Sequence, residues 1–312
     1  MSITNFTEDG EPSTSFQQQF CLPGLTNEVY VELICLIALN ICLSMTALLG
    51  NAIILVALHK EPSLYPPTKL LFRCLATTDL CVGLISEPLV VINLISVVRK
   101  RWIICYYSSL LSIIMGYILA SVSLFTLTAI SVDRFLALLL GLRYRQVVTL
   151  KRTYVATAFF WVLPIVSTAL YFWNNHITLW YGYIGIVFCL LTSTFAYTNI
   201  FFTLRHYRSR VENRVQQEQP RQSIPLNISR YRKAVSSALW LQLTLVVCYL
   251  PFGIADALLS QSGLSSTVFI AREFAVALVF LNSSLNPILY CWKIREVRQA
   301  VKDTIRHLFM LT

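Results

Sequence analysis

The segment Leu281-Asn282-Ser283-Ser284-Leu285-Asn286-Pro287-Ile288-Leu289-Tyr290 lies near the end of an apolar run from Val268 to Trp292. Two asparagines and two serines stand within five positions, although polar side chains are costly in hydrocarbon and normally face a protein interior or water. The proline removes a backbone donor, so an upstream carbonyl needs water or a neighbouring helix as its partner. The segment predicts a hydrated hinge with polar partners elsewhere in the chain; the alternative is a kinked helix with incidental polar residues.

The composition indicates a membrane protein. Of the 312 residues, 56% are hydrophobic and 13% are charged, and the mean hydropathy is +0.64. Soluble domains average about 25% charged residues. The net charge of +10 would also fit a nucleic-acid-binding protein, so the placement of the basic residues has to decide that question.

Seven apolar runs are long enough to span, since about 20 apolar residues cross a bilayer. They lie near Val29–Leu58, Thr68–Val98, Trp102–Leu138, Arg152–Trp173, Trp180–His206, Tyr231–Ser260 and Val268–Trp292. We therefore expect an all-α membrane protein, a seven-transmembrane helix bundle over residues 29–292. Residues 1–28 form a polar tail, and residues 293–312 form an amphipathic surface helix and a short end. The charged link Tyr207–Arg230 and the two tails are expected to be the flexible parts.

The basic residues set the expected orientation, because Lys and Arg gather on the cytoplasmic side. Most of the 25 basic residues lie in or beside the first, third and fifth links and the C-terminal tail. The exceptions are Arg99, Lys100, Arg101 and Arg272. We expect a multi-pass plasma-membrane protein with its N-terminus outside and its C-terminus in the cytoplasm. The positive charge then faces anionic membrane lipid and cytosolic partners, not nucleic acid.

Two further expectations depend on this orientation. Asn5-Phe6-Thr7 is a glycosylation acceptor if the N-terminal tail faces outside. Among the nine cysteines, Cys21 and Cys105 lie on the oxidising side, whereas the others fall inside spans, where cysteine behaves as a small hydrophobe. A Cys21–Cys105 disulfide and two free thiols both remain open.

Asp79, in the middle of the second span, is the costliest of the polar residues expected in the bilayer. An ionised aspartate there is expensive unless another group pairs with it. The candidates at similar depth are Asn51, Ser123, Asn282, Ser283 and Asn286.

The spans carry a set of short motifs in a fixed order. They are Gly50-Asn51; Leu75-Ala76-x-x-Asp79; Asp133-Arg134-Phe135; Leu142-Arg143-Tyr144; Trp161; Tyr197; Cys248-x-x-Pro251; and Asn286-Pro287-x-x-Tyr290. From about Val29 to Phe309 this pattern resembles the class A (rhodopsin-like) G protein-coupled receptors, with Phe135 in place of the usual tyrosine. One such motif is weak evidence, but the whole set in register is specific.

The resemblance implies a buried sodium ion. Asp79, Ser123, Asn282, Ser283 and Asn286 are similar to the complete set around the sodium of the family. A hard cation held by a carboxylate and neutral oxygens offsets the burial of that carboxylate. The alternative is a hydrogen-bonded water network without sodium.

The resemblance also implies an activation scheme. Asp133 restrains Arg134 at rest, and on activation the inner half of the sixth helix swings about Pro251 while Tyr197 and Tyr290 turn inward. A heterotrimeric G protein then fills the cleft, and the ligand shifts a pre-existing equilibrium.

Several positions depart from the family pattern. Tyr249 replaces a tryptophan, Leu245 replaces a phenylalanine, and Tyr231 stands where an acidic partner of the Arg134 position is common. Because that second restraint is missing, we expect basal activity.

Other departures suggest a branch of the family. Ser109 replaces the usual bridging cysteine, Cys189 replaces a proline, and the loop at about Asn174 to Leu179 is short and has no cysteine. These losses resemble the branch of melanocortin, cannabinoid, adenosine and lysophospholipid receptors.

The ligand class stays open between peptide, lipid and nucleoside. Gly116 lies where amine receptors carry an aspartate, and Phe280 lies where opsins carry a lysine, so neither a typical biogenic amine nor retinal is expected. The expected pocket residues are Glu87, Met115, Gly116, Leu119, Tyr249, Phe252, Asp256 and Val276. Glu87 at its depth needs a cation, whereas Arg272 and Glu273 are expected at a solvated helix end.

Two other functional classes compete with a signalling receptor. A transporter or channel would normally show internal repeats, and none is evident. A receptor-like protein that binds ligand without G protein signalling also fits. No nucleophile–base pair, metal cluster or phosphate loop is recognisable in the sequence, so an enzyme is not expected.

Overall fold

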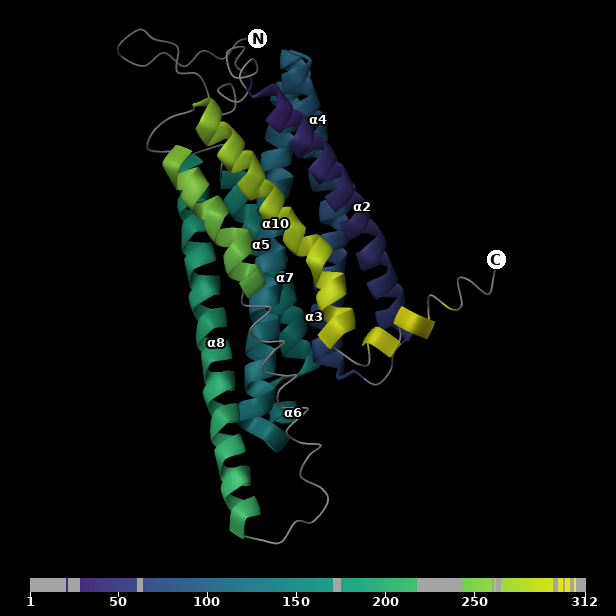
Figure 1. Cartoon of the computed structure of the whole chain (residues 1–312), viewed down its shortest axis with the longest axis vertical. Helices are drawn as coiled ribbons and strands as arrows, with labels where there is room; N and C mark the ends of the chain where they lie inside the picture. Colours follow the sequence, from purple (N-terminus) through teal and green to yellow (C-terminus); the bar gives the residue numbers. More distant parts are fainter. Residues whose placement is uncertain are drawn as a thin grey trace.

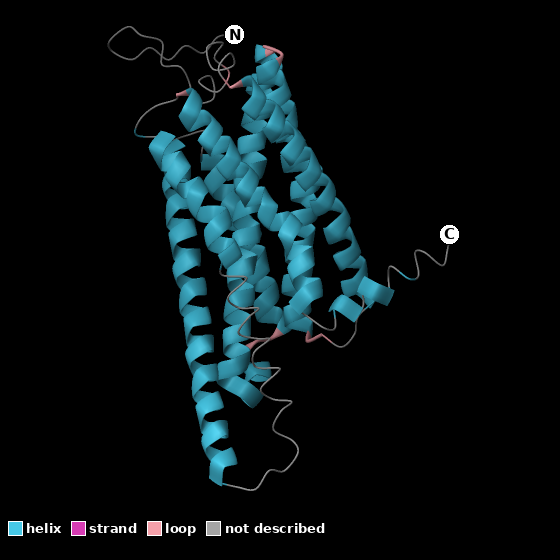
Figure 2. Cartoon of the chain, viewed as in Figure 1, coloured by secondary structure: helices cyan, strands magenta, loops and turns pink. Residues whose placement is uncertain are grey.

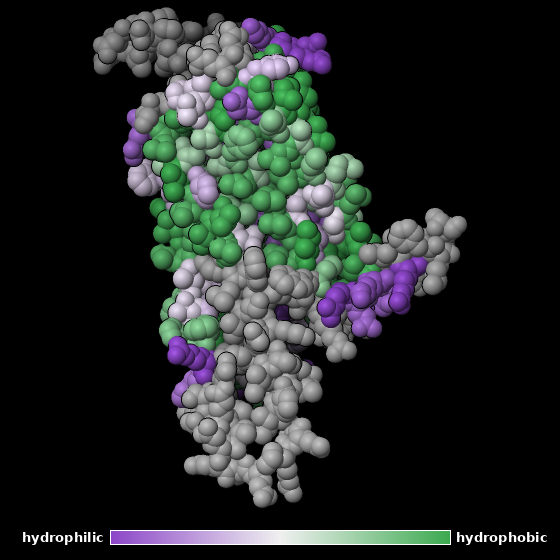
Figure 3. Space-filling view, in the orientation of Figure 1, coloured by the Kyte–Doolittle hydropathy of each residue, from purple (hydrophilic) through white to green (hydrophobic). Residues whose placement is uncertain are grey.

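The structure is a computed structural model, described for residues 21, 29–60, 64–170, 175–217, 243–259, 261, 265–293, 297–299, 301–303 and 306. Its helices form one elongated bundle joined by short connections (Figures 1 and 2). Apolar residues cover the flank of the bundle, as expected for a surface that faces lipid (Figure 3). The all-α prediction is confirmed, and the described part of the chain contains no strand.

Each predicted span coincides with a helix where it is described, and residues 231–242 of the predicted sixth span lie outside the described residues. The bounds are α2 Tyr30–Lys60; a continuous rod of α3 Pro66–Cys81, the π-helical turn η2 Val82–Ser86 and α4 Glu87–Val98; α5 Trp102–Leu140; α7 Leu150–Ala169; α8 Asn175–Gln217; Leu243–Leu259; and α10 Ser266–Lys293. After α5 come the 3₁₀ turn η3 Gly141–Arg143 and the short helix α6 Tyr144–Val147. Among the described residues, five helical rods are long and apolar enough to cross a membrane.

The helix α8 is longer than predicted at both ends. It begins at Asn175, so most of the expected loop at Asn174 to Leu179 is helical, and it ends at Gln217 instead of His206. The link that was expected to begin at Tyr207 is therefore helical as far as Gln217. Arg, Glu and Gln are good helix formers, so a helix can continue beyond the apolar run that hydropathy detects.

Both chain ends lie largely outside the described residues. Residues 297–299 and 301–303 are helical, and Val297 and Val301 are buried four positions apart, as an amphipathic helix requires. Asn5 lies outside the described residues. Cys21 is described and forms a disulfide with Cys105, with the two Cα atoms 6.1 Å apart.

The π-helical turn in the second rod reconciles Pro88 with a membrane helix. The Glu87 N–H donates to the Val82 carbonyl, five residues back. In the same register residue 88 would donate to Gly83, but Pro88 has no N–H. The Ser44 hydroxyl of α2 donates to the Gly83 carbonyl instead, at 2.7 Å.

A second proline is supported by α2 in the same way. Pro287 cannot donate to the Ser283 carbonyl one turn earlier, and the Asn51 amide donates to that carbonyl at 3.0 Å. The Pro287 ring also packs close to α2, because a Cβ added to Gly50 would lie 2.9 Å from Pro287 Cγ. The predicted hydrated hinge therefore has a helix–helix partner, supplied by the Gly50-Asn51 motif.

We expect Gly83→Ala to lower the melting temperature of the purified protein in lipid nanodiscs. The new Cβ would lie 2.9 Å from the Ser44 carbonyl oxygen and 3.0 Å from the Leu48 nitrogen, and overpacking of this kind costs about 1–3 kcal/mol. Gly253→Ala is the matched control, since its nearest neighbour would be a side-chain atom at 4.0 Å. Equal melting temperatures for the two variants would contradict the close helix approach.

Candidate functional site

Asp79 is fully buried and joins three helices. Its carboxylate accepts hydrogen bonds from Ser123 of α5 at 3.2 Å, from Ser283 of α10 at 2.9 Å and from the Asn286 amide of α10 at 2.7 Å. The predicted grouping therefore holds for three of the partner residues. Three polar donors distribute the charge of the aspartate, which makes its burial tolerable.

The same cluster has the chemistry of a sodium site. Asn286 Oδ1 is buried with no hydrogen-bond partner in the described structure, and so is Asn282 Nδ2. Carboxylate, hydroxyl and amide oxygens are the ligands that hard cations prefer. An unpaired oxygen beside a buried carboxylate fits a cation, which Asp79, Ser123, Ser283 and Asn286 would hold.

Asp133 and Arg134 lie near the opposite end of the bundle from Cys105. Asp133 is buried and accepts from Tyr144 of α6 at 2.6 Å and from Thr68 of α3 at 3.1 Å. Arg134 Nε lies 4.0 Å from the same carboxylate, and 44% of the Arg134 side chain is exposed. Asp133 is thus bound more closely by two hydroxyl groups than by its neighbouring arginine.

The other residues of the expected activation scheme, Tyr197, Pro251 and Tyr290, lie on three different helices. Ser131 of α5 donates to the Tyr197 hydroxyl of α8 at 2.8 Å, so Tyr197 is buried and tied to α5. Pro251 lies inside the Leu243–Leu259 helix. Tyr290 belongs to α10, and its side chain is outside the described structure.

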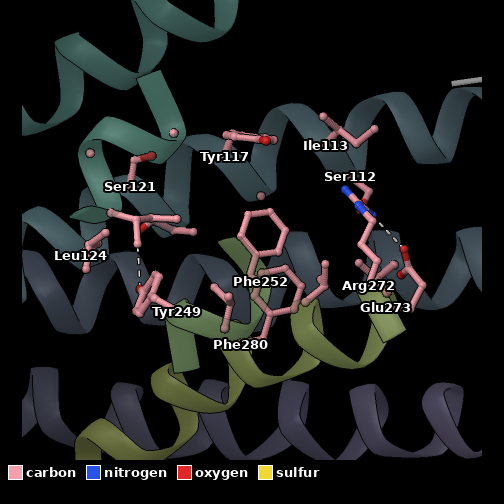
Figure 4. Close-up of a pocket in the computed structure, with 18 of the residues that line it drawn as sticks. Ser112, Ile113, Tyr117, Ser121, Leu124, Tyr249, Phe252, Arg272, Glu273 and Phe280 are labelled. Carbon is pink, nitrogen blue, oxygen red and sulfur yellow. Dashed lines mark hydrogen bonds and ion pairs between the residues drawn. The ribbon is translucent and has the colours of Figure 1, made fainter. Parts of the chain in front are cut away.

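A pocket lies among the helices of the bundle (Figure 4). It follows one face of α5 from Ser109 to Phe125, and it is also lined by α4, α8, α10 and the Leu243–Leu259 helix. Four predicted ligand-binding residues line it: Gly116, Tyr249, Phe252 and Val276.

The other four predicted ligand-binding residues do not line this pocket. Leu119 is buried elsewhere in the bundle, and Met115 is half-buried. Glu87 is fully buried, and neither of its carboxylate oxygens has a hydrogen-bond partner in the described structure. Asp256 lies behind the pocket wall, where it accepts from Tyr117 and Tyr183, each at 3.4 Å.

Arg272 and Glu273 correct the expectation of a solvated helix end. Both are buried and both line the pocket. Arg272 donates from Nη1 to Glu273 at 2.9 Å (Figure 4). It also donates from Nε to Asp256 at 3.3 Å. Sequence position near a helix start suggested solvent, but the pairing with Asp256 of another helix could not be read from a single sequence.

Two of the departures from the family pattern, Tyr249 and Ser109, fall at this pocket, whereas Leu245 is buried outside its lining and Tyr231 lies outside the described residues. Tyr249, in place of tryptophan, lines its floor, and its hydroxyl donates to the Ala120 carbonyl at 3.4 Å (Figure 4). Ser109, in place of the bridging cysteine, lines the pocket, and Cys189 is buried on α8. The Cys21 bridge to Cys105 attaches the tail to α5 one turn before Ser109.

Comparison with known proteins agrees with this geometry. The chain matches the family of 7 transmembrane receptors (rhodopsin family) over residues 50–178 and 167–290. It is 25% identical over 290 residues to adenosine receptor A3 of Ovis aries, covering 84% of this chain and 87% of the relative. It is 24% identical over 305 residues to adenosine receptor A3 of Bos taurus, covering 89% and 92%.

These findings confirm the expected family. Both relatives are adenosine receptors, which are one of the groups in the expected branch. The matched region contains the Asp79 cluster, the Asp133-Arg134 pair and the pocket. Members of the family are receptors and not enzymes. The chain belongs to the rhodopsin family of seven-transmembrane receptors.

Proposed function

We propose that this receptor binds an extracellular ligand in the α5-lined pocket and activates a heterotrimeric G protein at the Arg134 end of the bundle. In this proposal it is a multi-pass plasma-membrane protein with its N-terminus outside and its C-terminus in the cytoplasm. The Lys and Arg distribution supports that orientation, and so does the Cys21–Cys105 disulfide, since disulfides persist in oxidising compartments. The ligand is a peptide, a lipid or a nucleoside-like molecule.

The single observation that carries the proposal is the Asp79 cluster. It holds α3, α5 and α10 together through side-chain bonds of 2.7 to 3.2 Å. Two of these helices, α5 and α10, line the pocket, and α5 continues to Arg134. A ligand that moves α5 against α10 would have to rearrange these bonds, which couples the pocket to the Arg134 end.

A panel of heterotrimeric G proteins tests this function. The full-length receptor in lipid nanodiscs should accelerate GTPγS binding by at least one member, first without ligand and then with peptide, lipid and nucleoside libraries. Adenosine belongs in the panel because both relatives are adenosine receptors. Ion flux without G protein activation would favour a transporter or channel, and ligand binding without either would favour a non-signalling receptor.

We further propose that sodium occupies the Asp79 cluster in the resting receptor. Raising NaCl at constant ionic strength, with N-methylglucamine chloride as the replacement salt, should raise the melting temperature and lower agonist affinity. Asp79→Asn should abolish both effects, because it removes the charge that binds the cation. A sodium response that survives in Asp79→Asn would show that sodium acts at another site, and the absence of any sodium response in the unmodified receptor would indicate the alternative, a water network.

Basal activity should depend on what holds Asp133. We expect measurable G protein activation without ligand, and we expect Tyr144→Phe to reduce it about two- to tenfold. Without the 2.6 Å hydrogen bond from Tyr144, the Asp133 carboxylate is left to pair with Arg134, which strengthens the restraint on Arg134. A hydrogen bond to a charged group is worth about 1.5–3 kcal/mol, and we expect only part of that free energy to appear as a stronger Asp133–Arg134 pair.

The matched control for this variant is Tyr154→Phe, on an exposed face of α7. Surface expression of each variant has to be equal before activities are compared. Unchanged or increased basal activity in Tyr144→Phe would show that Tyr144 and Arg134 do not compete for Asp133. Arg134→Ala should abolish signalling while ligand binding remains.

A further inference from the structure

We infer that the pocket binds a cationic amphiphile: a lipid-like molecule with one protonated amine that pairs with Glu273 and an apolar chain that lies along α5. This inference rests on the proposed function, because it names the ligand class of the same pocket. It is narrower than the peptide, lipid or nucleoside choice, and it follows from the shape, the lining and the charge of the site.

The pocket is long and follows one helix. Its lining residues on α5 run from Ser109 to Phe125, and at 1.5 Å per residue this distance is about 24 Å. The lined stretch of α5 is therefore longer than one leaflet of the hydrocarbon core, which is about 15 Å thick. An elongated ligand can fill such a space along its whole length, whereas a compact ligand would occupy only part of it.

Most of the deeper lining is apolar, and glycines make the room. Leu124, Phe125 and Ile186 line the deeper part. A Cβ added to Gly116 would meet only Phe280 at 4.0 Å, and one added to Gly185 would meet nothing within 4 Å. Peptide groups placed here would lose hydrogen bonds to water without replacement, so an apolar chain fits better than a peptide.

The charged groups gather at the Cys105 end of the pocket, where α10 begins. Arg272, Asp256 and Glu273 are all buried, and Arg272 pairs with both acids, so among the described residues of this cluster one positive charge faces two negative charges. Asp256 is bound by Arg272, Tyr117 and Tyr183 behind the wall, whereas Glu273 lines the pocket itself (Figure 4). A buried excess of negative charge is costly, and a cationic head group beside Glu273 would offset it.

An anionic head group fits this cluster poorly. A carboxylate or phosphate would approach Arg272 in the presence of two carboxylates that already accept from it at 2.9 and 3.3 Å. It would then add a third negative charge to a site of low dielectric, where like charges repel strongly. The sign of the net charge therefore selects an amine over an acid, although Gly116 supplies no aspartate of the kind found in amine receptors.

Direct binding to the purified full-length receptor tests the inference. In lipid nanodiscs, hexadecylamine should raise the melting temperature in a saturable manner. Hexadecanol, hexadecanoate and adenosine serve as probes with a neutral head, an anionic head and no chain, and they should produce no such rise. Glu273→Gln keeps an oxygen for Arg272 but removes the charge, and should weaken the apparent affinity for hexadecylamine about ten- to hundredfold.

A second variant keeps the test valid if Glu273→Gln folds poorly. Gly185→Leu should fill the space on the chain side and weaken hexadecylamine at least about tenfold, with no loss of melting temperature in the absence of amphiphile, because the site has room for a side chain. Ile184→Leu, on the exposed face of α8, is the matched control and should bind like the unmodified receptor.

The outcomes separate this inference from the proposed function. Saturable binding of hexadecylamine that both pocket variants weaken supports it, whether or not a G protein is activated. Equal stabilisation by hexadecanoate or hexadecanol, stabilisation by adenosine alone, or no saturable binding of hexadecylamine overturns it. G protein activation in the same preparation, measured separately, would leave the receptor function standing in those cases.

Discussion

The bundle depends on one helix, α2, whose side chains donate hydrogen bonds to the backbone carbonyls that two prolines of neighbouring helices leave unbonded. Asn51 of α2 donates to the Ser283 carbonyl that Pro287 leaves unbonded, and Ser44 of α2 donates to the Gly83 carbonyl below Pro88. In a bilayer an unbonded carbonyl has no water to replace its partner. The two proline-interrupted rods can therefore be stable only where α2 lies against them.

This constraint determines where the polar residues of the bundle can stand. Because Asn51 fixes α10 at Ser283, the Ser283 hydroxyl and the Asn286 amide reach Asp79 at 2.9 and 2.7 Å. Asp79 in turn reaches Ser123 of α5, the longest face of the pocket. The hinge and the buried carboxylate are consequently parts of one polar network, and this network is attached to the helix that forms one side of the pocket.

The sequence was sufficient for the features that depend on local chemistry or on motifs in register. Apolar runs predicted each span, the hinge predicted a polar partner, and Asp79 predicted the hydroxyl and amide groups around it. The sequence was not sufficient where burial depends on contacts between helices, or where the length of a helix depends on helix propensity beyond the membrane. Arg272 is buried because Asp256 lies opposite it, α8 continues to Gln217 because its polar residues favour helix, and the orientation of Met115 and Leu119 follows from the packing of α5.

The buried acids at the two ends of the bundle are paired differently, and the difference fits the function that we propose for each end. At the pocket, Asp256 and Glu273 share one arginine that is itself buried, which leaves a net charge for an incoming molecule to balance. At the other end, Asp133 is satisfied by Tyr144 and Thr68, and Arg134 remains nearly half exposed. An arginine that is only weakly paired costs little to release, so the free energy of a ligand need not be spent on breaking a strong ion pair there. In the proposed function, the free energy of activation would then go mainly into the Asp79 network, where three hydrogen bonds of 2.7 to 3.2 Å have to rearrange together.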